Sequence, residues 1–216
     1  MSKTRKITLI GMFSALAYVF TFVGHFIPIS FTDFLRYDPK DAIIVIAGLS
    51  LGALPALIIS VIVAFLELVT ISTTGFIGFA MNVISSATFA CVASFVYKRI
   101  RSLGGATLGL VLSSLLTVAF MLLWNYLITP LYMGVPREAV AQMLLPVILP
   151  FNVIKCGLNS ALTMLIYKPC TTALRRIGLM KAQGDKAQGT KINPVVIALS
   201  LGVAVLMIAL FIFLRN

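Results

Sequence analysis

Six long apolar segments divide this chain and restrict it to one kind of environment. A helix needs about 20 apolar residues to cross the roughly 30 Å hydrocarbon core of a bilayer. Of the 216 residues, 60% are hydrophobic and only 11% are charged. Because only helices and closed barrels satisfy their backbone polar groups in lipid, we predict an all-α integral membrane protein. The apolar segments are residues 7–27, 43–69, 76–97, 108–132, 146–167 and 195–214.

One of these segments is predicted to contain two helices. Residues 43–69 are too long for a single crossing and carry Gly48, Gly52 and Pro55 near their centre. Glycine and proline at this spacing favour a tight turn. The prediction is therefore a six-helix transmembrane bundle followed by one extra C-terminal transmembrane helix. The expected parts are a membrane domain, a polar cytosolic linker and the extra helix, over residues 1–178, 179–193 and 194–216.

The Lys and Arg residues are unevenly distributed between the loops, and this predicts the orientation of the chain. If the N-terminus is cytosolic, the cytosolic segments hold twelve of the 17 basic residues. The positive-inside rule then predicts a multi-pass protein with its N-terminus inside. We expect it in the plasma membrane of a prokaryote. The same rule accounts for the net charge of +11 without a nucleic-acid partner. The basic residues assigned to the outer segments are Arg36, Lys40, Arg137 and Arg215.

A polar stripe in the sixth predicted crossing is the main indication of function. Asn152, Lys155 and Asn159 are spaced so that they share one face of an otherwise apolar helix. A lysine near the middle of a bilayer costs roughly 2.5–3.5 kcal/mol, so a partner or a ligand is expected for it. Lys155 either contacts a ligand or neutralises Glu67, the one carboxylate inside a predicted crossing.

Enzymatic function is not indicated. The chain has a single histidine, His25, for which we expect a structural role, and it lacks paired intramembrane carboxylates and the His-Glu-x-x-His and Gly-x-Ser-x-Gly motifs. It has no phosphate-binding loop, so an ATP-driven step would need another subunit. The spacing of Cys91, Cys156 and Cys170 does not suit a metal, and we expect free thiols and no metal site.

Several motifs together carry a resemblance to a known family over about the first 175 residues. They are Gly11-Met-Phe-Ser-Ala-Leu-Ala-Tyr18, Phe34-Leu-Arg-Tyr-Asp-Pro-Lys-Asp41, Gly78-Phe-Ala-Met-Asn-Val-Ile-Ser-Ser-Ala-Thr88, Trp124-Asn-Tyr126 with Pro130-Leu-Tyr-Met133, and Pro150-Phe-Asn-Val-Ile-Lys155. In this combination the chain resembles the riboflavin-binding substrate-specificity (S) components of energy-coupling factor (ECF) transporters. That family has six helices, so the seventh crossing is a departure from it.

The resemblance implies a vitamin-capture protein whose pocket faces the outside, lined by the first outer loop and helices four to six. It implies delivery of riboflavin inward when the chain docks on a transmembrane coupling subunit and two ATPases. Riboflavin would then be the transported ligand rather than a prosthetic group, and whether FMN is also carried stays open. The alternatives are an S component for thiamine, folate, biotin or pantothenate, and a structural membrane protein without a small ligand.

The chemistry of riboflavin suggests roles for particular side chains. One edge of its ring system carries carbonyls, an N–H group and ring nitrogens, which amides complement and a lysine can donate to. Apolar and aromatic side chains would stack on its faces. The predicted contacts are Asn152, Lys155, Asn125, Asn159 and Asn82, walls from Leu35, Phe79, Trp124 or Tyr126, and the loop residues Tyr37, Asp38 and Asp41 as a gate.

Each of these residues also has a structural alternative. Asn125 and Asn159 would also suit hydrogen bonds between helices. The Asp-Pro turn before Asp41 would suit a helix start, and Trp124 an aromatic belt at the membrane interface. On the first helix, Gly11 and Ala15 are four residues apart and present a small surface, which the resemblance assigns to docking on the coupling subunit. Packing inside the bundle is the alternative for this pair.

Overall fold

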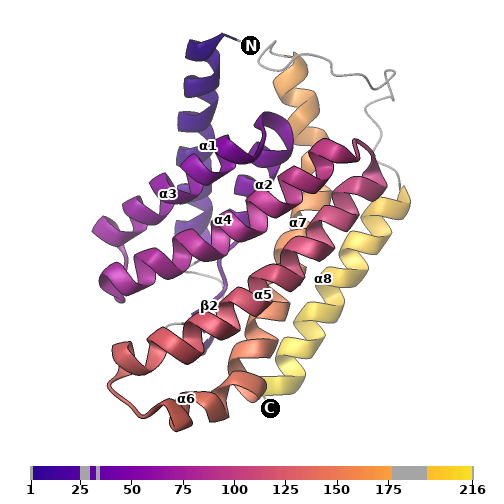
Figure 1. Cartoon of the computed structure of the whole chain (residues 1–216). Coiled ribbons are helices and arrows are strands. Elements are labelled where there is room, and N and C mark those ends of the chain that lie inside the picture. The colour runs from indigo at the N-terminus through magenta and orange to yellow at the C-terminus, as the bar shows by residue number, and fades with distance from the viewer. Residues whose placement is uncertain (1, 25–29, 33–34, 177–193, 216) are drawn as a thin grey trace.

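Long antiparallel helices make up almost all of the computed structural model, which describes residues 2–24, 30–32, 35–176 and 194–215 (Figure 1). The elements, in chain order, are α1 (Lys3–Gly24), β1 (Ser30–Thr32), β2 (Leu35–Arg36), α2 (Lys40–Leu51), α3 (Ala53–Thr70), α4 (Gly75–Arg99), α5 (Leu103–Met133), α6 (Arg137–Met143), the π-helical turn η1 (Leu144–Ile148), α7 (Leu149–Arg176) and α8 (Pro194–Arg215). The N- and C-termini lie at opposite ends of the bundle.

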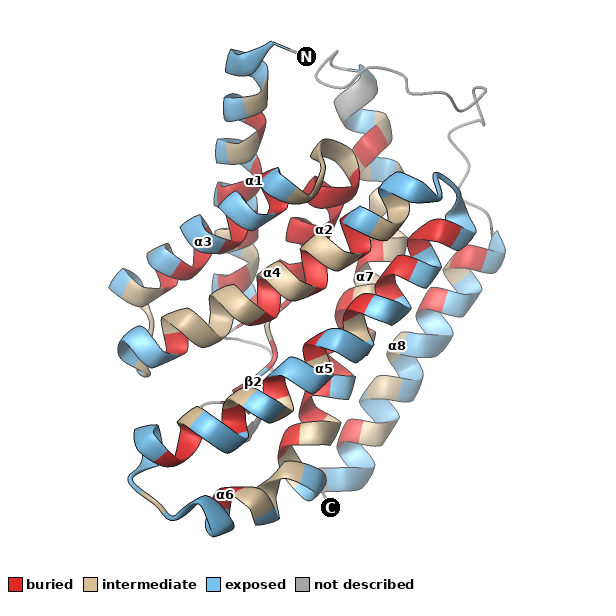
Figure 2. Ribbon diagram, in the orientation of Figure 1, coloured by how far each residue is buried: buried red, intermediate tan, exposed pale blue. Residues whose placement is uncertain are grey.

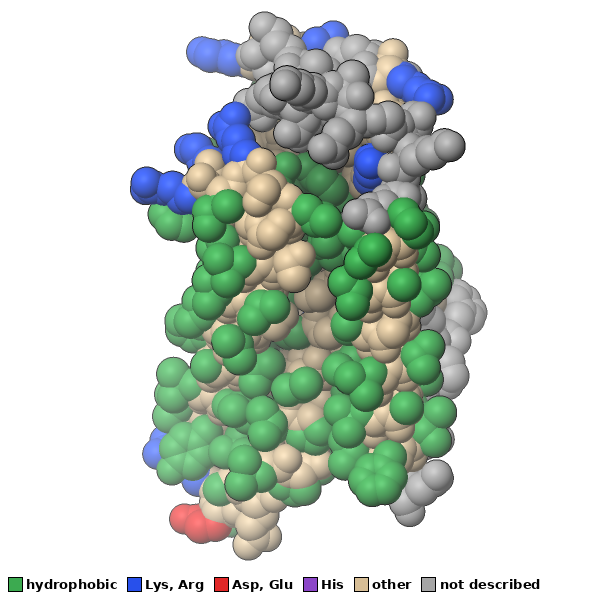
Figure 3. Space-filling view, turned by 90° about the vertical axis from the view of Figure 1, so that its right-hand side faces the viewer, with side chains coloured by type: hydrophobic (Ala, Val, Ile, Leu, Met, Phe, Trp, Pro, Cys, Tyr) green, Lys and Arg blue, Asp and Glu red, His purple; other side chains and the backbone are tan. Residues whose placement is uncertain are grey.

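Within the described residues, six helical stretches are long and apolar enough to cross a membrane. They are α1, α3, α4, α5, the continuous stretch from α6 to α7, and α8. Their outward faces are exposed, as Figure 2 shows. In Figure 3 the apolar side chains cover most of the surface between the two ends, and most of the Lys and Arg side chains in view lie at the end that holds the N-terminus. The predicted all-α membrane protein is confirmed.

The predicted division of residues 43–69 is confirmed at Gly52, which has a φ of +102° and separates α2 from α3. The prediction that the first of these two helices crosses the membrane needs correction. With 12 residues, α2 is about 18 Å long and is shorter than a full crossing. It is enclosed by α1, α3, α4 and α7 instead, because it begins inside the bundle and ends at Gly52.

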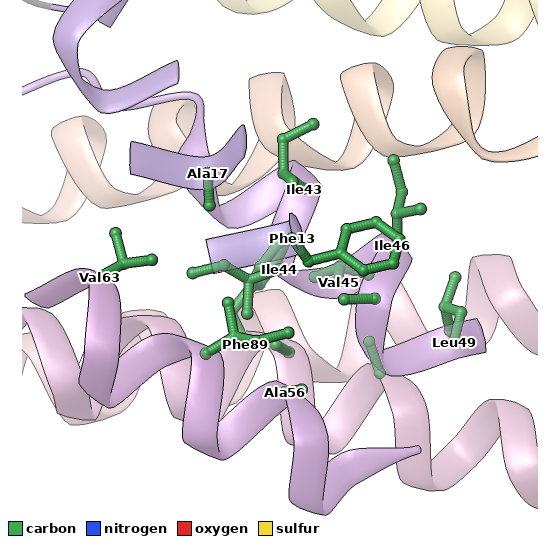
Figure 4. Packing of buried hydrophobic residues seen from close by; sticks show 14 of the residues in the cluster. Phe13, Ala17, Ile43, Ile44, Val45, Ile46, Leu49, Ala56, Val63 and Phe89 are labelled. Carbon is green, nitrogen blue, oxygen red and sulfur yellow. The ribbon is translucent and has the colours of Figure 1, made fainter. Parts of the chain in front are cut away.

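The core forms around this enclosed helix. Ile44 and Val45 of α2 are fully buried and pack with Phe13 of α1, Val63 of α3 and Phe89 of α4 (Figure 4). Apolar residues around the whole circumference of a helix are typical of a buried one. The core therefore fixes α2 and the residues just before it relative to the long helices.

The end opposite the N-terminus contains the irregular structure. β1 and β2 pair in antiparallel orientation within the predicted first outer loop. The π-helical turn η1 contains Pro146, which cannot donate the backbone hydrogen bond of a regular helix. Turns of this kind often occur next to functional sites, and η1 leads directly into Phe151 and Asn152 of α7.

Two predictions fall wholly or largely outside the described residues. The cytosolic linker over 179–193 belongs to the stretch 177–193, and His25 belongs to the stretch 25–29. Beyond the linker, α8 packs along α7, as the yellow and orange helices show in Figure 1.

Candidate functional site

A cavity of about 180 Å³ lies in the half of the bundle away from the N-terminus. Its walls come from the end of α1, the segment from β2 to α2, the end of α3 with the turn that follows, the first turns of α4, the second half of α5 and the first turns of α7. Side chains that line it include Leu35, Tyr37, Asp38, Glu67, Ile71, Met81, Asn82, Met121, Asn125, Phe151, Asn152 and Lys155.

The cavity brings together residues that are far apart in the sequence, and many of them belong to the predicted set. Those that line it are Asn152, Lys155, Asn125, Asn82, Leu35, Tyr37 and Asp38. Those that do not are Asn159, Phe79, Trp124 and Tyr126. Tyr126 is 40% exposed and points about 100° away from the cavity-lining Asn125 around the axis of α5.

A buried charge cluster forms one wall. The ammonium of Lys40 lies 2.6 Å from Asp38 Oδ2 and 2.6 Å from Glu67 Oε1, and the Lys40 side chain is only 1% exposed. Asn82 donates to Glu67 Oε2 at 2.7 Å, and Thr21 donates to Glu67 Oε1 at 3.1 Å. We call Asp38, Lys40, Glu67, Asn82 and Thr21 the Lys40 cluster. It joins the segment before α2 to α1, α3 and α4.

Lys40 corrects two predictions. It had been counted as an outer-loop residue, but it is the first residue of α2 and lies inside the protein. It is also the residue that neutralises Glu67, so the pairing of Lys155 with Glu67 is wrong. No local pattern in the sequence indicated this pairing, because it depends on how deeply α2 enters the bundle.

The protonation of the loop residues follows from their surroundings. Burial alone would raise the pKa of Asp38, but the charges of Lys40 and then Lys155 outweigh it and hold that pKa below its ordinary value. Burial raises the pKa of Tyr37, and the negative charges of Asp38 and Asp41 raise it further. Asp38 is therefore a carboxylate, and the Tyr37 hydroxyl keeps its proton and can donate it in a hydrogen bond.

Lys155 has a different partner. Its ammonium lies 3.4 Å from Asp41 Oδ2, and Ser86 donates a hydrogen bond to the other oxygen of Asp41. Asp41 is thus buried between α4 and α7 and is 3% exposed, so it does not lie in an outer gate. The long distance to Asp41 leaves Lys155 able to donate to a second acceptor in the cavity, which it also lines.

The cavity amides are held by hydrogen bonds to their own helices. Asn152 donates to the carbonyl of Ile148 at 2.8 Å, and Asn125 donates to the carbonyl of Met121 at 2.7 Å. Thr129 donates to the amide oxygen of Asn125. Among the described residues, the amide oxygen of Asn152 has no hydrogen-bond partner, so Asn152 can offer an acceptor as well as an N–H group to a ligand.

Asn159 lies farther along α7. Seven residues separate it from Asn152, a rise of about 10 Å, which places it beyond the cavity. Its amide donates to the backbone carbonyl of Asp38 at 3.0 Å, and its oxygen is buried without a partner among the described residues. The structure thus gives Asn159 the role of holding the segment before α2 against α7.

Sequence reasoning missed one aromatic wall residue. Phe151 lines the cavity and packs with Leu35, Val140 and Ile148 in a second buried cluster. Phe151 and Lys155 are four residues apart and share a helix face, which was the available signal. Because Val140 belongs to α6, this short helix packs against the residues that form this wall of the cavity.

Gly11 and Ala15 are exposed on α1, so they are not packed inside the bundle. A Cβ atom added at Gly11 would meet no other atom within 4 Å. The alternative of internal packing is therefore excluded for this pair. A small, open surface remains on the side of α1 that faces away from the other helices.

Comparison with known proteins gives consistent matches. The family described as "ECF transporter, substrate-specific component" matches residues 5–167. The riboflavin transporter RibU of Staphylococcus aureus is 26% identical over 82% of this chain and 96% of its own length. The riboflavin transporter FmnP of Bacillus subtilis is 28% identical over 71% of this chain and 85% of its own length. A solved S component of a bacterial ECF transporter is 26% identical and superposes with a TM-score of 0.69, covering 81% of this chain and all of the solved one.

Proposed function

Because this chain belongs to the family of substrate-specific components of ECF transporters, we propose that it binds riboflavin in the cavity between α1, α3, α4, α5 and α7. The family consists of transporter components, so the expectation that the chain is not an enzyme is confirmed. The proposal extends to capture of the vitamin from outside and its release inward when the chain docks on a transmembrane coupling subunit and two ATPases.

The observation that carries the proposal is the composition of the cavity wall. Asn152 and Lys155 of α7 both line the cavity and offer donors and an acceptor, which complement the polar edge of an isoalloxazine ring. Tyr37 and Phe151 offer aromatic faces for stacking on the ring. On another wall, Asp38, Asn82 and Asn125 offer acceptors and amides for the hydroxyls of the ribityl chain. Both curated relatives named above are riboflavin transporters.

The first test is the visible absorption spectrum of the protein purified in detergent from cells grown in rich medium. Flavin is coloured, so we expect near-stoichiometric flavin absorption without addition of ligand. A colourless protein that also fails to quench the fluorescence of added riboflavin would contradict the proposal. Thiamine, folate, biotin and pantothenate would then be tried with the same preparation.

A substitution tests the assigned site. Asn152→Ala should weaken riboflavin binding about tenfold, or roughly 1.4 kcal/mol, the scale of one lost polar contact to the ligand. The thermal unfolding temperature should change little, because the one hydrogen bond that the Asn152 side chain makes to the described residues is local, to Ile148 one turn earlier. Titration of riboflavin fluorescence measures the affinity. Lys98→Ala, an exposed lysine at the other end of the bundle, is the control and should bind as the parent does.

We also propose that the N-terminus is cytosolic, so that the cavity is reached from outside. The basic residues at the N-terminal end, from α1, the end of α4 and the end of α7, support this orientation. In a chain whose native cysteines are replaced, Arg137→Cys should react with a membrane-impermeant maleimide on intact cells, and Lys98→Cys should react only after permeabilisation. The reverse pattern would overturn the orientation.

A further inference from the structure

The last helix, α8, lies beyond the part of the chain that the family shares. The family match ends at residue 167. The match to the solved S component covers all of that chain but only 81% of this one. The match to the S. aureus relative covers 96% of the relative but only 82% of this chain. The additional residues therefore form structure that the six-helix bundle does not require.

The packing of α8 is concentrated on α7. At Gly157 the two helices approach so closely that a Cβ atom there would lie 2.7 Å from both Cγ and Sδ of Met207. A glycine at such a point allows one helix to rest against the backbone of the other. Phe211 lies one turn beyond Met207 and is only 6% exposed, whereas most large side chains of α8 are exposed.

Phe211 shares its buried cluster with a residue of the cavity wall. The cluster consists of Tyr37, Ile154, Leu158 and Phe211, with Met207 and other α8 residues packed against it. Tyr37 lines the cavity and is itself 7% exposed. The Phe211 ring of α8 therefore belongs to the same buried cluster as Tyr37, which lines the cavity.

The segment that carries Tyr37 is attached to several helices, and its contacts with α7 are the ones next to α8. It runs from β2 to the start of α2 and is held to α7 by the hydrogen bond from Asn159 to the carbonyl of Asp38. Its charged side chain, Asp38, faces Lys40 on the other side. The Tyr37 ring itself is buried against Ile154 and Leu158 of α7 and Phe211 of α8, which form one cluster with it.

We propose that α8 is a positioning element of the substrate site, in which Phe211 holds Tyr37 in place and thereby slows release of the bound ligand. A ring that is already fixed loses less conformational freedom when it stacks on a ligand, so fixing it favours the bound state. The effect on ligand release rests on the proposed function. The effect of Phe211 on Tyr37 rests on the structure alone. A helix that served only as a membrane anchor would have no effect on Tyr37.

The experiment compares two substitutions on the same helix in the full chain. Phe211→Ala removes the buried ring, and Phe213→Ala removes a ring that is 78% exposed and serves as the matched control. We measure the rate of riboflavin dissociation by recovery of flavin fluorescence, and amide hydrogen exchange of the segment from Leu35 to Tyr37 without ligand. Phe211→Leu is a third variant that preserves most of the apolar volume.

We expect Phe211→Ala to release riboflavin about tenfold faster and to speed exchange of the Leu35–Tyr37 segment, Phe211→Leu to have a smaller effect, and Phe213→Ala to have none. Equal dissociation and exchange in the Phe211 and Phe213 variants would overturn the inference. If Phe211→Ala unfolds in detergent, Phe211→Leu is compared with Phe213→Ala instead, and equal dissociation and exchange in these two variants would overturn the inference. If the parent binds no riboflavin, the proposed function fails, while the exchange measurement still supports or overturns the role of Phe211.

Discussion

Replacement of Lys40 by alanine is expected to lower the free energy of unfolding by about 3–5 kcal/mol, more than any other single substitution considered for this protein. The ammonium of Lys40 is surrounded by the carboxylates of Asp38 and Glu67 and is closed off from solvent. Its removal would leave the buried carboxylate of Glu67 without its positive partner, and Asp38 with only the weaker effect of the Lys155 charge. Removal of one partner from a buried ion pair is costly because the remaining charge keeps its desolvation penalty.

The loss should be seen as a lower unfolding temperature in detergent, together with poor recovery of folded protein. Lys98→Ala removes the same charge from an exposed position and should change stability by less than about 0.5 kcal/mol. A double variant, Lys40→Met with Glu67→Gln, removes the charge from both partners and should be more stable than Lys40→Ala. If Lys40→Ala and Lys98→Ala unfold at the same temperature, the Lys40 cluster does not contribute to stability as argued.

The long helices could be predicted because an apolar segment that crosses the lipid core must satisfy its own backbone hydrogen bonds, and a helix of about 20 residues does so. The turn at Gly52 could be predicted from its neighbours for the same reason. The short length and buried position of α2 could not. Nothing in residues 40–51 distinguishes a helix enclosed by other helices from one that crosses the bilayer, because both are apolar on every side.

The residues of the cavity were partly predictable from helix geometry. Asn152 and Lys155 share a face and both line the cavity. The aromatic neighbours of Asn125 do not, since adjacent helical residues point about 100° apart. Once Asn125 faces the cavity, Trp124 and Tyr126 turn away from it. The aromatic rings that line the cavity, Tyr37 and Phe151, belong to other elements.

The pairing of charges was the least predictable feature. Lys155 and Lys40 both needed carboxylates, and the sequence offered Glu67, Asp38 and Asp41. Which lysine meets which carboxylate depends on how deeply α2 enters the bundle, and this depth is set by packing between helices rather than by any local pattern.

Replacement of Ala15 by tryptophan is expected to abolish riboflavin uptake by cells while riboflavin binding by the purified protein stays within about twofold of the parent. Gly11 and Ala15 form a small, exposed surface on α1, and neither residue lines the cavity. On the proposed function, this surface is where a helix of the coupling subunit approaches. Small residues four apart allow two membrane helices to pack closely, and an indole ring would hold them apart.

Uptake is measured with labelled riboflavin in cells that lack other riboflavin transport, and binding with the detergent-purified variant. Ala15→Ser is the size control and should retain uptake, because a hydroxyl adds little volume at a helix contact. Co-purification of the coupling subunit should fall with Ala15→Trp in parallel with uptake. Loss of binding together with uptake would assign Ala15 to the fold, and full uptake by Ala15→Trp would place the docking surface elsewhere on the bundle.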